Sequence, residues 1–425
     1  MLRLDRRISP ILRRVPDVNQ RLTRRTGLVI GTVAFALAVW FLRRPDQLLH
    51  PYVWVEENQI LNMYQTHGLI QSVLSPYMGY FLWPTSFTVG FAAAVSFLHV
   101  PEIDYWLSTA WFVATACLIL LPESSLALRW RIGMVGLLVL APMNPEVYGI
   151  ALYSFWWTTL WPLISLMWSK DYWWLRIPVL IIGGMSSLAG AALFVPYALL
   201  FALSRRRRDL VGAAILGLTF VVQAIAYITS SRAGQVPIHP WRITQQELRN
   251  FADYALAWLR PTNTDFLAFA GACILLGLLG VVAYSAVRRR MPNTNEIIAL
   301  VAGLLVVGVL SSVAAPLLSD PILAGPRYYF LPFVVLSWLL LTIAATSELG
   351  WARVAAAGLI IMSLFALSYD FSRHEDPVSW SDQLAKCRTA TGPFPVPVHY
   401  NGVISEMWPA RLMITPETCH RLGYH

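Results

Sequence analysis

Long apolar runs recur along this chain of 425 residues and constrain its fold more than any other feature. They are about 17–25 residues long, which is the length that a helix needs to cross the hydrocarbon core of a bilayer. Charged residues make up only 13% of the chain, whereas a soluble protein carries about 25%. The sequence therefore predicts an all-α polytopic membrane protein that has membrane lipid as a partner.

Basic residues predict how the chain is threaded. The net charge is +9, and nearly all of it comes from arginines in short clusters between the apolar runs. This pattern is typical of cytoplasmic loops and gives no reason to expect a nucleic-acid partner. The first 25 residues hold eight arginines, so 1–26 is expected to be a cytoplasmic arm. Further basic clusters are expected on the same side, at Arg129 with Arg131, Lys170 with Arg176, Arg205 to Arg208 and Arg288 to Arg290.

Keeping every basic cluster in the cytoplasm requires an even number of crossings between successive clusters. This condition predicts about eleven transmembrane helices, with the N-terminus cytoplasmic and the C-terminus outside, in the periplasm or the extracellular space. It makes 81–99 a juxtamembrane or re-entrant segment on the outer face, and it splits 176–203 into two crossings near Gly183 to Gly190. The expected spans lie near 27–42, 105–122, 131–143, 151–168, 176–188, 189–203, 210–229, 265–287, 295–316, 328–346 and 351–369.

The same assignment divides the chain into five parts. After the basic arm, 27–229 forms a transmembrane module that contains a first outer loop, 43–104. A second outer loop, 230–264, precedes the C-terminal spans in 265–369, and 370–425 forms a small outer tail. Cys387 and Cys419 both lie in this tail, where an oxidising compartment favours a disulfide between them. Cys117 and Cys273 fall within spans, where cysteine is typically small apolar filler.

Two adjacent glutamates, Glu56 and Glu57, follow the first span. Apolar and aromatic neighbours should partly desolvate them, and desolvation and like charge both raise the pKa of a carboxyl group. A glutamate tuned in this way can act as a general base toward a hydroxyl. The same pair is also typical of a solvated helix start, where acids are favourable.

Two further groups are candidates for chemistry at the outer face. Glu146, beside Asn144, is an isolated acid at the outer end of the third span, where an ionisable residue suggests function or a helix start. Arg327 and Tyr328 lie at the outer mouth of the tenth span. The planar fork of arginine suits a phosphate, although a snorkelling anchor has the same sequence pattern.

The second outer loop supplies other candidates. His239 and Arg242 could contact a lipid phosphate. Thr244 and Glu247 have the spacing of a capping box, which predicts a helix start. The helix is expected to lie on the membrane surface with one apolar face, made of Leu248, Phe251, Ala255 and Trp258. No Cys/His spacing suggests zinc, so no cofactor is predicted and a divalent metal is left open.

The first loop carries a recognisable pattern. It reads Trp54-Val55-Glu56-Glu57, then Gly68, then Pro76-Tyr77-Met78-Gly79-Tyr80. With Glu146 after the third span, it resembles the GT-C superfamily of integral-membrane glycosyltransferases. That superfamily includes the protein O-mannosyltransferases and the bacterial aminoarabinose transferase of lipid A. The closer similarity is to a poorly characterised bacterial group with a Trp-x-Glu-Asp motif in this loop.

The resemblance covers about the first 210 residues and is weaker beyond them, where Arg327-Tyr328-Tyr329 and the two-cysteine tail match. Two departures affect the assignment of roles. Glu57 replaces the family's aspartate, which blurs which of the two acids is the base, although the spacing to Gly68 favours Glu57. Trp83-Pro84-Thr85 stands where the family commonly has Pro-Arg, which leaves the phosphate ligand less defined.

The resemblance implies a GT-C fold in the bacterial inner membrane and an activity on its periplasmic face. A sugar would pass from a polyprenyl-phosphate-linked donor to a hydroxyl of a glycan or lipid acceptor, with inversion. Glu57 or Glu56 would be the base and Glu146 would orient the acceptor, while Arg327, Tyr328, Arg242 and His239 bind the donor. Substrate contacts would come from Tyr77, Tyr80, Asn144 and Trp156, although the aromatic stripe around Trp156 is also typical of a bundle core.

Two other functions fit the same sequence. A transporter or flippase of lipid-linked sugars would use the same cavity without making a bond. It should show paired broken helices in two repeated halves, and the sequence shows one such break, near Gly183 to Gly190. A polysaccharide polymerase or ligase would use a diphosphate lipid and basic residues of an outer loop, such as His239 and Arg242.

Overall fold

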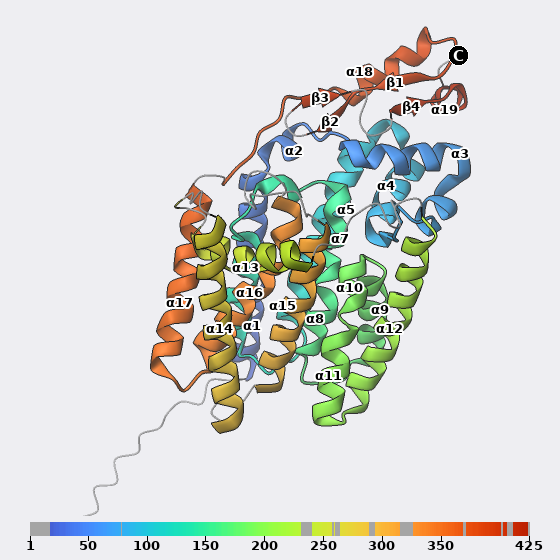
Figure 1. Ribbon diagram of the computed structural model, residues 1–425. Coiled ribbons are helices and arrows are strands. Elements are labelled where there is room, and N and C mark those ends of the chain that lie inside the picture. Colours follow the sequence, from blue (N-terminus) through green and yellow to red (C-terminus); the bar gives the residue numbers. More distant parts are fainter. Residues whose placement is uncertain are drawn as a thin grey trace, which may run out of the picture.

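The computed structural model describes residues 18–77, 79–230, 240–256, 259, 264–288, 294–314, 326–368, 371–400, 403–405 and 411–423. Helices run side by side along one direction and form a bundle, and the C-terminal tail lies across one end of it (Figure 1). The chain is therefore mostly helical. The predicted all-α membrane class is confirmed at this level.

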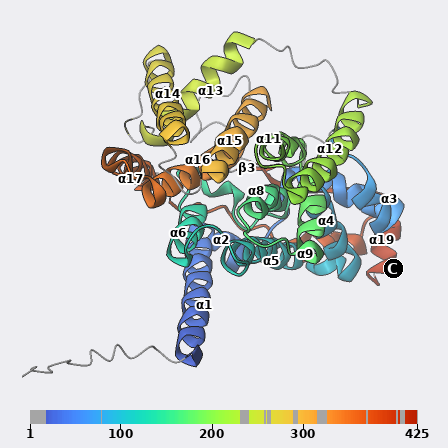
Figure 2. The same cartoon turned by 90° about the horizontal axis from the view of Figure 1, so that it is seen from below.

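Six helical segments in the described part of the chain are long and apolar enough to cross a membrane: Thr23–Arg43, Phe97–Leu120, Arg207–Ile228, Asp265–Tyr284, Thr294–Val313 and Tyr328–Thr346. They belong to α1 (Val18–Arg43), η2 (Phe97–His99) with α5 (Val100–Leu120), α12 (Arg207–Ile228), α14 (Thr264–Arg288), α15 (Thr294–Ala314) and α16 (Pro326–Thr346). The most apolar part of α16 is 83% buried and that of α1 only 17%. Figure 2 shows α1 at the edge of the bundle, so α16 is a core helix and α1 an outer one.

The other expected crossings are shorter or broken helices. Three are apolar and 10–17 residues long: Trp173–Gly184, Leu188–Ser204 and Gly350–Phe365. Ser187 separates the first two, and its side chain accepts a hydrogen bond from the Gly190 backbone N–H, as an N-cap does. The predicted break near Gly183 to Gly190 is therefore confirmed. The shorter helices in the regions of the other expected crossings are α6 (Leu128–Val139), η4 (Ala151–Tyr153), α7 (Ser154–Thr159), α8 (Trp161–Leu166), α9 (Trp173–Gly184), α10 (Leu188–Ala192), α11 (Phe194–Ser204) and α17 (Gly350–Phe365) with η6 (Ala366–Ser368).

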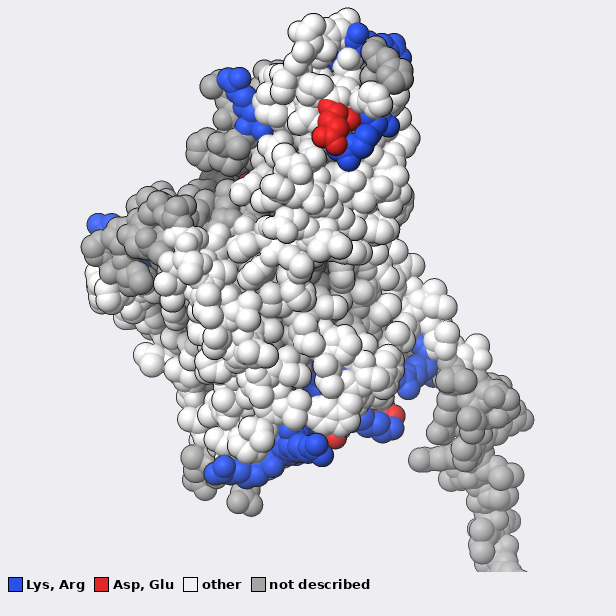
Figure 3. Space-filling model, turned by 90° about the vertical axis from the view of Figure 1, so that its right-hand side faces the viewer, with Lys and Arg blue, Asp and Glu red and all other residues white. Residues whose placement is uncertain are grey.

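Basic loops meet at one end of the bundle. Lys170 Nζ lies 2.7 Å from Glu123 Oε1, and Arg208 donates to the carbonyl oxygen of Ser169 over 3.0 Å. Arg25 donates to the carbonyl oxygen of Leu121 at the same end. Figure 3 shows blue side chains gathered at the end opposite to the tail, with a wide uncharged band between the two ends. This distribution agrees with one threading direction for the clusters that the structure describes.

The opposite end carries short elements that hold the candidate site. They are α2 (Pro45–Leu49), η1 (Val55–Glu57), α3 (Asn58–Leu74), α4 (Trp83–Val95) and η3 (Pro145–Val147). Figure 1 shows α2, α3 and α4 beneath the tail. Gly68, with φ +79°, bends α3 in a conformation that L side chains rarely adopt. The segment 81–99 thus folds at this end as α4 followed by η2.

The tail is a small disulfide-linked unit. Its elements are α18 (Trp380–Ala385), η7 (Lys386–Arg388), β1 (Phe394–Val396), β2 (Val398–Tyr400), β3 (Val403–Ser405), β4 (Leu412–Ile414) and α19 (Pro416–Arg421). Strands β1 and β4 pair antiparallel, as do β2 and β3. A Cys387–Cys419 disulfide joins η7 to α19, which confirms the predicted pairing.

The helix in the segment expected to be the second outer loop, α13 (Pro240–Leu256), runs across the bundle (Figure 1). The predicted capping box is wrong, because Thr244 lies inside the helix and donates to the carbonyl oxygen of Pro240. Glu247 is buried and accepts from Ser312 of α15 over 3.1 Å. Phe251 and Ala255 of the expected apolar face are buried, but the helix also turns polar residues inward, since Asn250 and Asp253 are buried too.

Candidate functional site

The two glutamates of the first loop lie on the single turn η1, in different environments. Glu57 is 1% exposed. One of its oxygens accepts from the Trp54 N–H over 2.9 Å, as a carboxylate in a capping box does. The other accepts from the Leu152 N–H over 2.8 Å. Burial raises the pKa of Glu57 to about 7, against the lowering effect of these two backbone hydrogen bonds.

Glu56 points to the more open side of the same turn. It is half-buried, and its Oε2 accepts from the indole N–H of Trp54 over 2.9 Å. Neighbouring residues on a helical turn point in different directions, so the two acids are not equivalent. Glu57 fastens η1 to the segment around Leu152, whereas Glu56 presents its carboxylate beside an aromatic ring.

Glu146 is brought to the same place by the connection after α6. Asn144 caps η3 by accepting from the Glu146 N–H over 3.0 Å, and Pro145 sits in the first turn, where a missing N–H costs nothing. The Glu146 side chain is buried and accepts from the Tyr153 hydroxyl. Because Tyr153 directly follows Leu152, the bundle fixes Glu57 and Glu146 through one short segment. Glu56, Glu57 and Glu146 with these neighbours form what we call the acid site.

A buried ion pair lies next to the acid site and contacts its backbone. Arg44 Nε and Nη2 each lie 2.9 Å from an oxygen of Asp46. Burial alone raises the pKa of Asp46, but the hydrogen bonds and charge of Arg44 outweigh it and hold that pKa below its usual range. Arg44 also donates to the backbone carbonyl oxygen of Glu146, 3.3 Å away. The residue that follows α1 is therefore hydrogen-bonded to η3.

The tail contributes two residues that the sequence analysis did not select. Arg373 Nη1 lies 3.3 Å from Glu146 Oε2, and its guanidinium carbon lies 5.7 Å from the centre of the Trp54 ring. His399 packs against Tyr52, with ring centroids 3.7 Å apart and the ring planes tilted by 35°. Burial, together with the charge of Arg44, lowers the pKa of His399 to about 4. The imidazole is thus neutral at neutral pH.

Asp104, in the first turns of α5, was also missed. It is 4% exposed, and neither of its oxygens has a hydrogen-bond partner among the residues that the structure describes. Its carboxyl group interacts electrostatically with that of Glu57. An acid at the start of an apolar span is a signal for function that sequence analysis could have used.

Other predicted residues lie elsewhere. Tyr77 and Tyr80 pair through two backbone hydrogen bonds. The turn between them packs at the C-terminal end of α12, because a Cβ at Gly79 would lie 2.6 Å from Ser230 Oγ, just after that helix, and 3.7 Å from the Tyr227 ring within it. Trp156 is buried and packs against Phe155, with ring centroids 4.3 Å apart and the ring planes tilted by 39°. This position is that of a bundle-core residue.

The predicted donor ligands are only partly described. Arg242 is exposed on α13, and Tyr328 is half-buried on α16. Arg327 occupies the first turn of α16, but its side chain lies outside the described residues, as does all of His239. Within the described ranges, no group of three His, Cys, Asp or Glu side chains is arranged to hold a metal ion.

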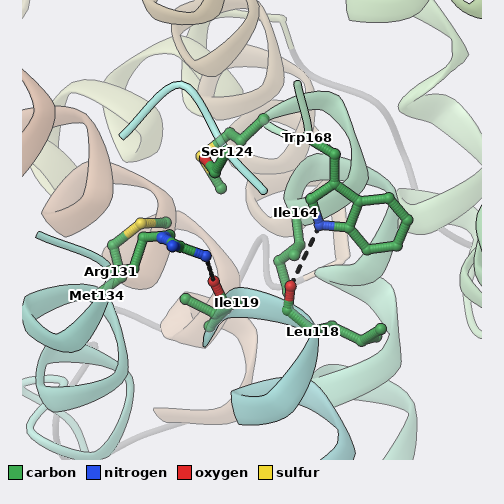
Figure 4. A pocket seen from close by; sticks show the side chains of 8 residues that line it. Leu118, Ile119, Ser124, Arg131, Met134, Ile164 and Trp168 are labelled. Carbon is green, nitrogen blue, oxygen red and sulfur yellow. Dashed lines mark hydrogen bonds between the residues drawn. The ribbon is translucent and has the colours of Figure 1, made fainter. Parts of the chain in front are cut away.

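One small cavity lies at the basic end of the bundle. Figure 4 shows Arg131 and Trp168 at its wall, each donating to a backbone carbonyl oxygen at the end of α5. Its volume is about 10 Å³, near the smallest space that holds one water. It is a packing space far from the acid site.

Comparison with protein-family models, with curated proteins and with solved structures finds no match to this chain.

Proposed function

We propose that this protein is a glycosyltransferase that moves a sugar from a polyprenyl-phosphate donor to an acceptor hydroxyl on the periplasmic face of a bacterial inner membrane. The observation that carries the proposal is the convergence of Glu56, Glu57 and Glu146 at the end of the bundle opposite to the basic loops. A lipid-linked sugar presents its headgroup at this level while its tail stays in the bilayer.

The contacts favour Glu56 as the general base, with Glu57 as the residue that positions it. Both oxygens of Glu57 already accept backbone hydrogen bonds, whereas Glu56 is half-buried beside the Trp54 ring. The acceptor hydroxyl would give its proton to Glu56 as its oxygen attacks the anomeric carbon. The bond from that carbon to the phosphate oxygen breaks, and polyprenyl phosphate leaves with the electron pair. One displacement inverts the anomeric centre.

Arg327 is proposed to hold the donor phosphate, with Tyr328 beside it. The support is its place in the first turn of α16, the helix that runs through the core of the bundle and whose Tyr329 accepts from Gln246 of α13. A guanidinium binds phosphate through two parallel N–H bonds. Arg242, exposed on α13, is a second basic residue on an outer element.

The test is transfer by the purified protein in liposomes, with a panel of labelled polyprenyl-phosphate and polyprenyl-diphosphate sugars. Transfer from a monophosphate donor is expected, and Arg327→Ala should lower kcat/KM roughly 10- to 150-fold, since a charge-assisted contact is worth about 1.5–3 kcal/mol. Use of diphosphate donors alone would indicate a polymerase or ligase. Movement of labelled lipid across the bilayer without any new glycosidic bond would indicate a transporter.

A further inference from the structure

We propose that Arg373 is a positioning residue of the acid site and that the C-terminal tail carries it there as the outer wall of that site. This inference rests on the proposed function, because the residue that it positions is one of the three acids. The helical bundle supplies all three acids, and one oxygen of Glu146 pairs with a residue more than two hundred positions away in the sequence.

Arg373 joins the tail to both halves of the acid site. Its Nη1 lies 3.3 Å from Glu146 Oε2 and 3.3 Å from Asn144 Oδ1. Its Nε lies 2.5 Å from Glu375, which neutralises part of its charge. Its guanidinium also lies over the ring of Trp54, whose indole N–H donates to Glu56. The Arg373 side chain therefore contacts Glu146 directly and also contacts Trp54, the residue that donates to Glu56.

The geometry indicates what this contact does. The bundle holds one oxygen of Glu146 through the Tyr153 hydroxyl, and the tail holds the other through Arg373. A carboxylate held at both oxygens keeps one orientation. The Arg373 side chain is 15% exposed, so a solute in the site can reach its edge. Without Arg373, Glu146 would keep Tyr153 but lose its fixed second contact.

Several contacts hold the tail in this place. The Arg373 N–H donates to the carbonyl oxygen of Arg43, and the His399 N–H donates to that of Val53, over 3.0 and 3.2 Å. Trp380 donates from its indole to the carbonyl oxygen of Phe97 over 2.8 Å. The first contact lies at the end of α1, the second just before η1 and the third at the start of η2.

Two amide side chains of α3, Asn62 and Gln65, hold the second half of the tail through hydrogen bonds, and we call this pair the amide clasp. Asn62 donates to the carbonyl oxygen of Arg411 over 2.9 Å and accepts from the Met413 N–H over 3.1 Å. Gln65 donates to the carbonyl oxygen of Met413 over 2.7 Å and accepts from the Thr415 N–H over 3.2 Å. Each amide thus pairs with the strand backbone as a neighbouring strand would. The Cys387–Cys419 disulfide ties this clasped half to α18, which lies on Phe97.

A purely structural role for Arg373 predicts a different experiment from a positioning role. We would measure kcat and KM for wild type, Arg373→Ala and Arg373→Lys, with Arg411→Ala as the matched control, because Arg411 is an exposed arginine of the same tail. Hydrogen exchange of the Met413 amide would report in each variant whether the tail is still docked. Guanidinium added to Arg373→Ala would test whether the missing group can be replaced.

Arg373→Ala is expected to lower kcat about 10- to 100-fold with little change in KM or in tail exchange. Guanidinium should restore part of kcat, lysine should retain less than arginine does, and Arg411→Ala should match wild type. Unchanged kcat in Arg373→Ala overturns the proposal. So does a loss of kcat that appears only with faster tail exchange and that guanidinium does not rescue, since arginine would then only hold the tail.

A second measurement separates this inference from the proposed function. Arg373→Met and Glu146→Gln would be compared singly and together for their effects on thermal unfolding, which requires no substrate. Non-additive effects are expected for two residues in direct contact. If the wild type transfers no sugar but the effects are non-additive, the proposed function fails while the coupling of tail and acid stands. Additive effects overturn the inference itself.

Discussion

Arg373 Nη1 lies 3.3 Å from Glu146 Oε2, although 227 positions separate the two residues in the sequence. Glu146 is 3% exposed, and a carboxylate so deeply buried is costly unless it is paired and hydrogen-bonded. Tyr153 from the bundle and Arg373 from the tail meet this requirement together. The acid site is therefore assembled from two distant parts of the chain.

The two glutamates of η1 should differ in their effect on transfer. Glu56→Gln is expected to lower kcat by about 10²–10⁴-fold, because the amide cannot take the acceptor proton. Glu57→Gln should have a smaller effect on kcat and a larger one on thermal stability, since its amide nitrogen would face one of two backbone N–H donors. Steady-state kinetics with melting curves would check both. Full activity in both single variants and in the double variant would leave the acid site without a base.

Glu57 should make stability depend on pH. Its pKa is raised to about 7 from 4.5, so between these values the folded state holds more protons than the unfolded state. The free energy of unfolding then falls as pH rises through this window, by about 3 kcal/mol in total for this group. The full contribution is present below pH 4.5 and is lost above pH 7. Unfolding from pH 4.5 to 8 should give a flatter curve for Glu57→Gln than for wild type, and parallel curves would contradict the prediction.

The amide clasp should control the opening of the tail. Gln65→Ala removes the acceptor of the Thr415 N–H and the donor to the Met413 carbonyl oxygen. Loss of about 1.4 kcal/mol of local stability would make the Thr415 amide exchange roughly tenfold faster. Thr66→Ala is a matched control on the same helix, because its hydroxyl donates only within that helix to carbonyl oxygens of Asn62 and Met63. Equal exchange in the two variants would mean that Gln65 does not hold β4.

Two glycine substitutions should have opposite effects on stability. A Cβ at Gly308 of α15 would lie 1.9 Å from Glu247 Oε1, whereas one at Gly277 of α14 would meet nothing within 4 Å. Gly308→Ala should therefore destabilise the protein by about 1–3 kcal/mol through overpacking. Gly277→Ala should raise the stability by about 0.5–1 kcal/mol, because alanine favours helix. Melting temperatures in one detergent would check both signs, and a stabilised Gly308→Ala variant would mean that α13 does not press on this glycine.

The two ends of the bundle should be accessible from opposite sides of the membrane. Thr391, in the tail, and Lys170, in a basic loop, are both exposed. A cysteine at Thr391 should react with an impermeant thiol reagent in intact cells, and one at Lys170 only after the cells are opened. Both variants would be made without Cys117 and Cys273. The reverse labelling pattern would move the acid site to the cytoplasmic face.

The local sequence was sufficient where a feature depends on neighbouring residues. The apolar runs predicted the membrane class, because length and hydropathy decide whether a helix can span a bilayer. The break near Gly183 to Gly190 was predicted from the condition of even crossings between basic clusters and was placed at small residues, and Ser187 caps the helix that follows it. The disulfide followed from two cysteines in one short tail. These inferences use apolar runs, charge clusters and cysteine positions, all of which are read directly from the sequence.

The number of crossings is less determined by sequence. The regions expected at 131–143 and 151–168 form the 12-residue α6 and the two 6-residue helices α7 and α8. Hydropathy does not distinguish a long span from several short helices inside a bundle, because both are apolar and both are buried by neighbours. Only packing against helices such as α16 settles their lengths.

Tertiary structure alone decided how the acid site is composed. The adjacency of Glu56 and Glu57 is in the sequence, but their different surroundings arise because Leu152, far along the chain, donates to Glu57 only. Arg373 and Asp104 reach the site through the docked tail and the start of α5. The capping-box prediction at Thr244 also failed for a tertiary reason. Thr244 lies inside α13, and Glu247 accepts a hydrogen bond from Ser312 of another helix instead of capping the start of its own. Hydropathy and local spacing act over a few residues, whereas the energy of a buried charge depends on whichever groups the fold brings within hydrogen-bond distance.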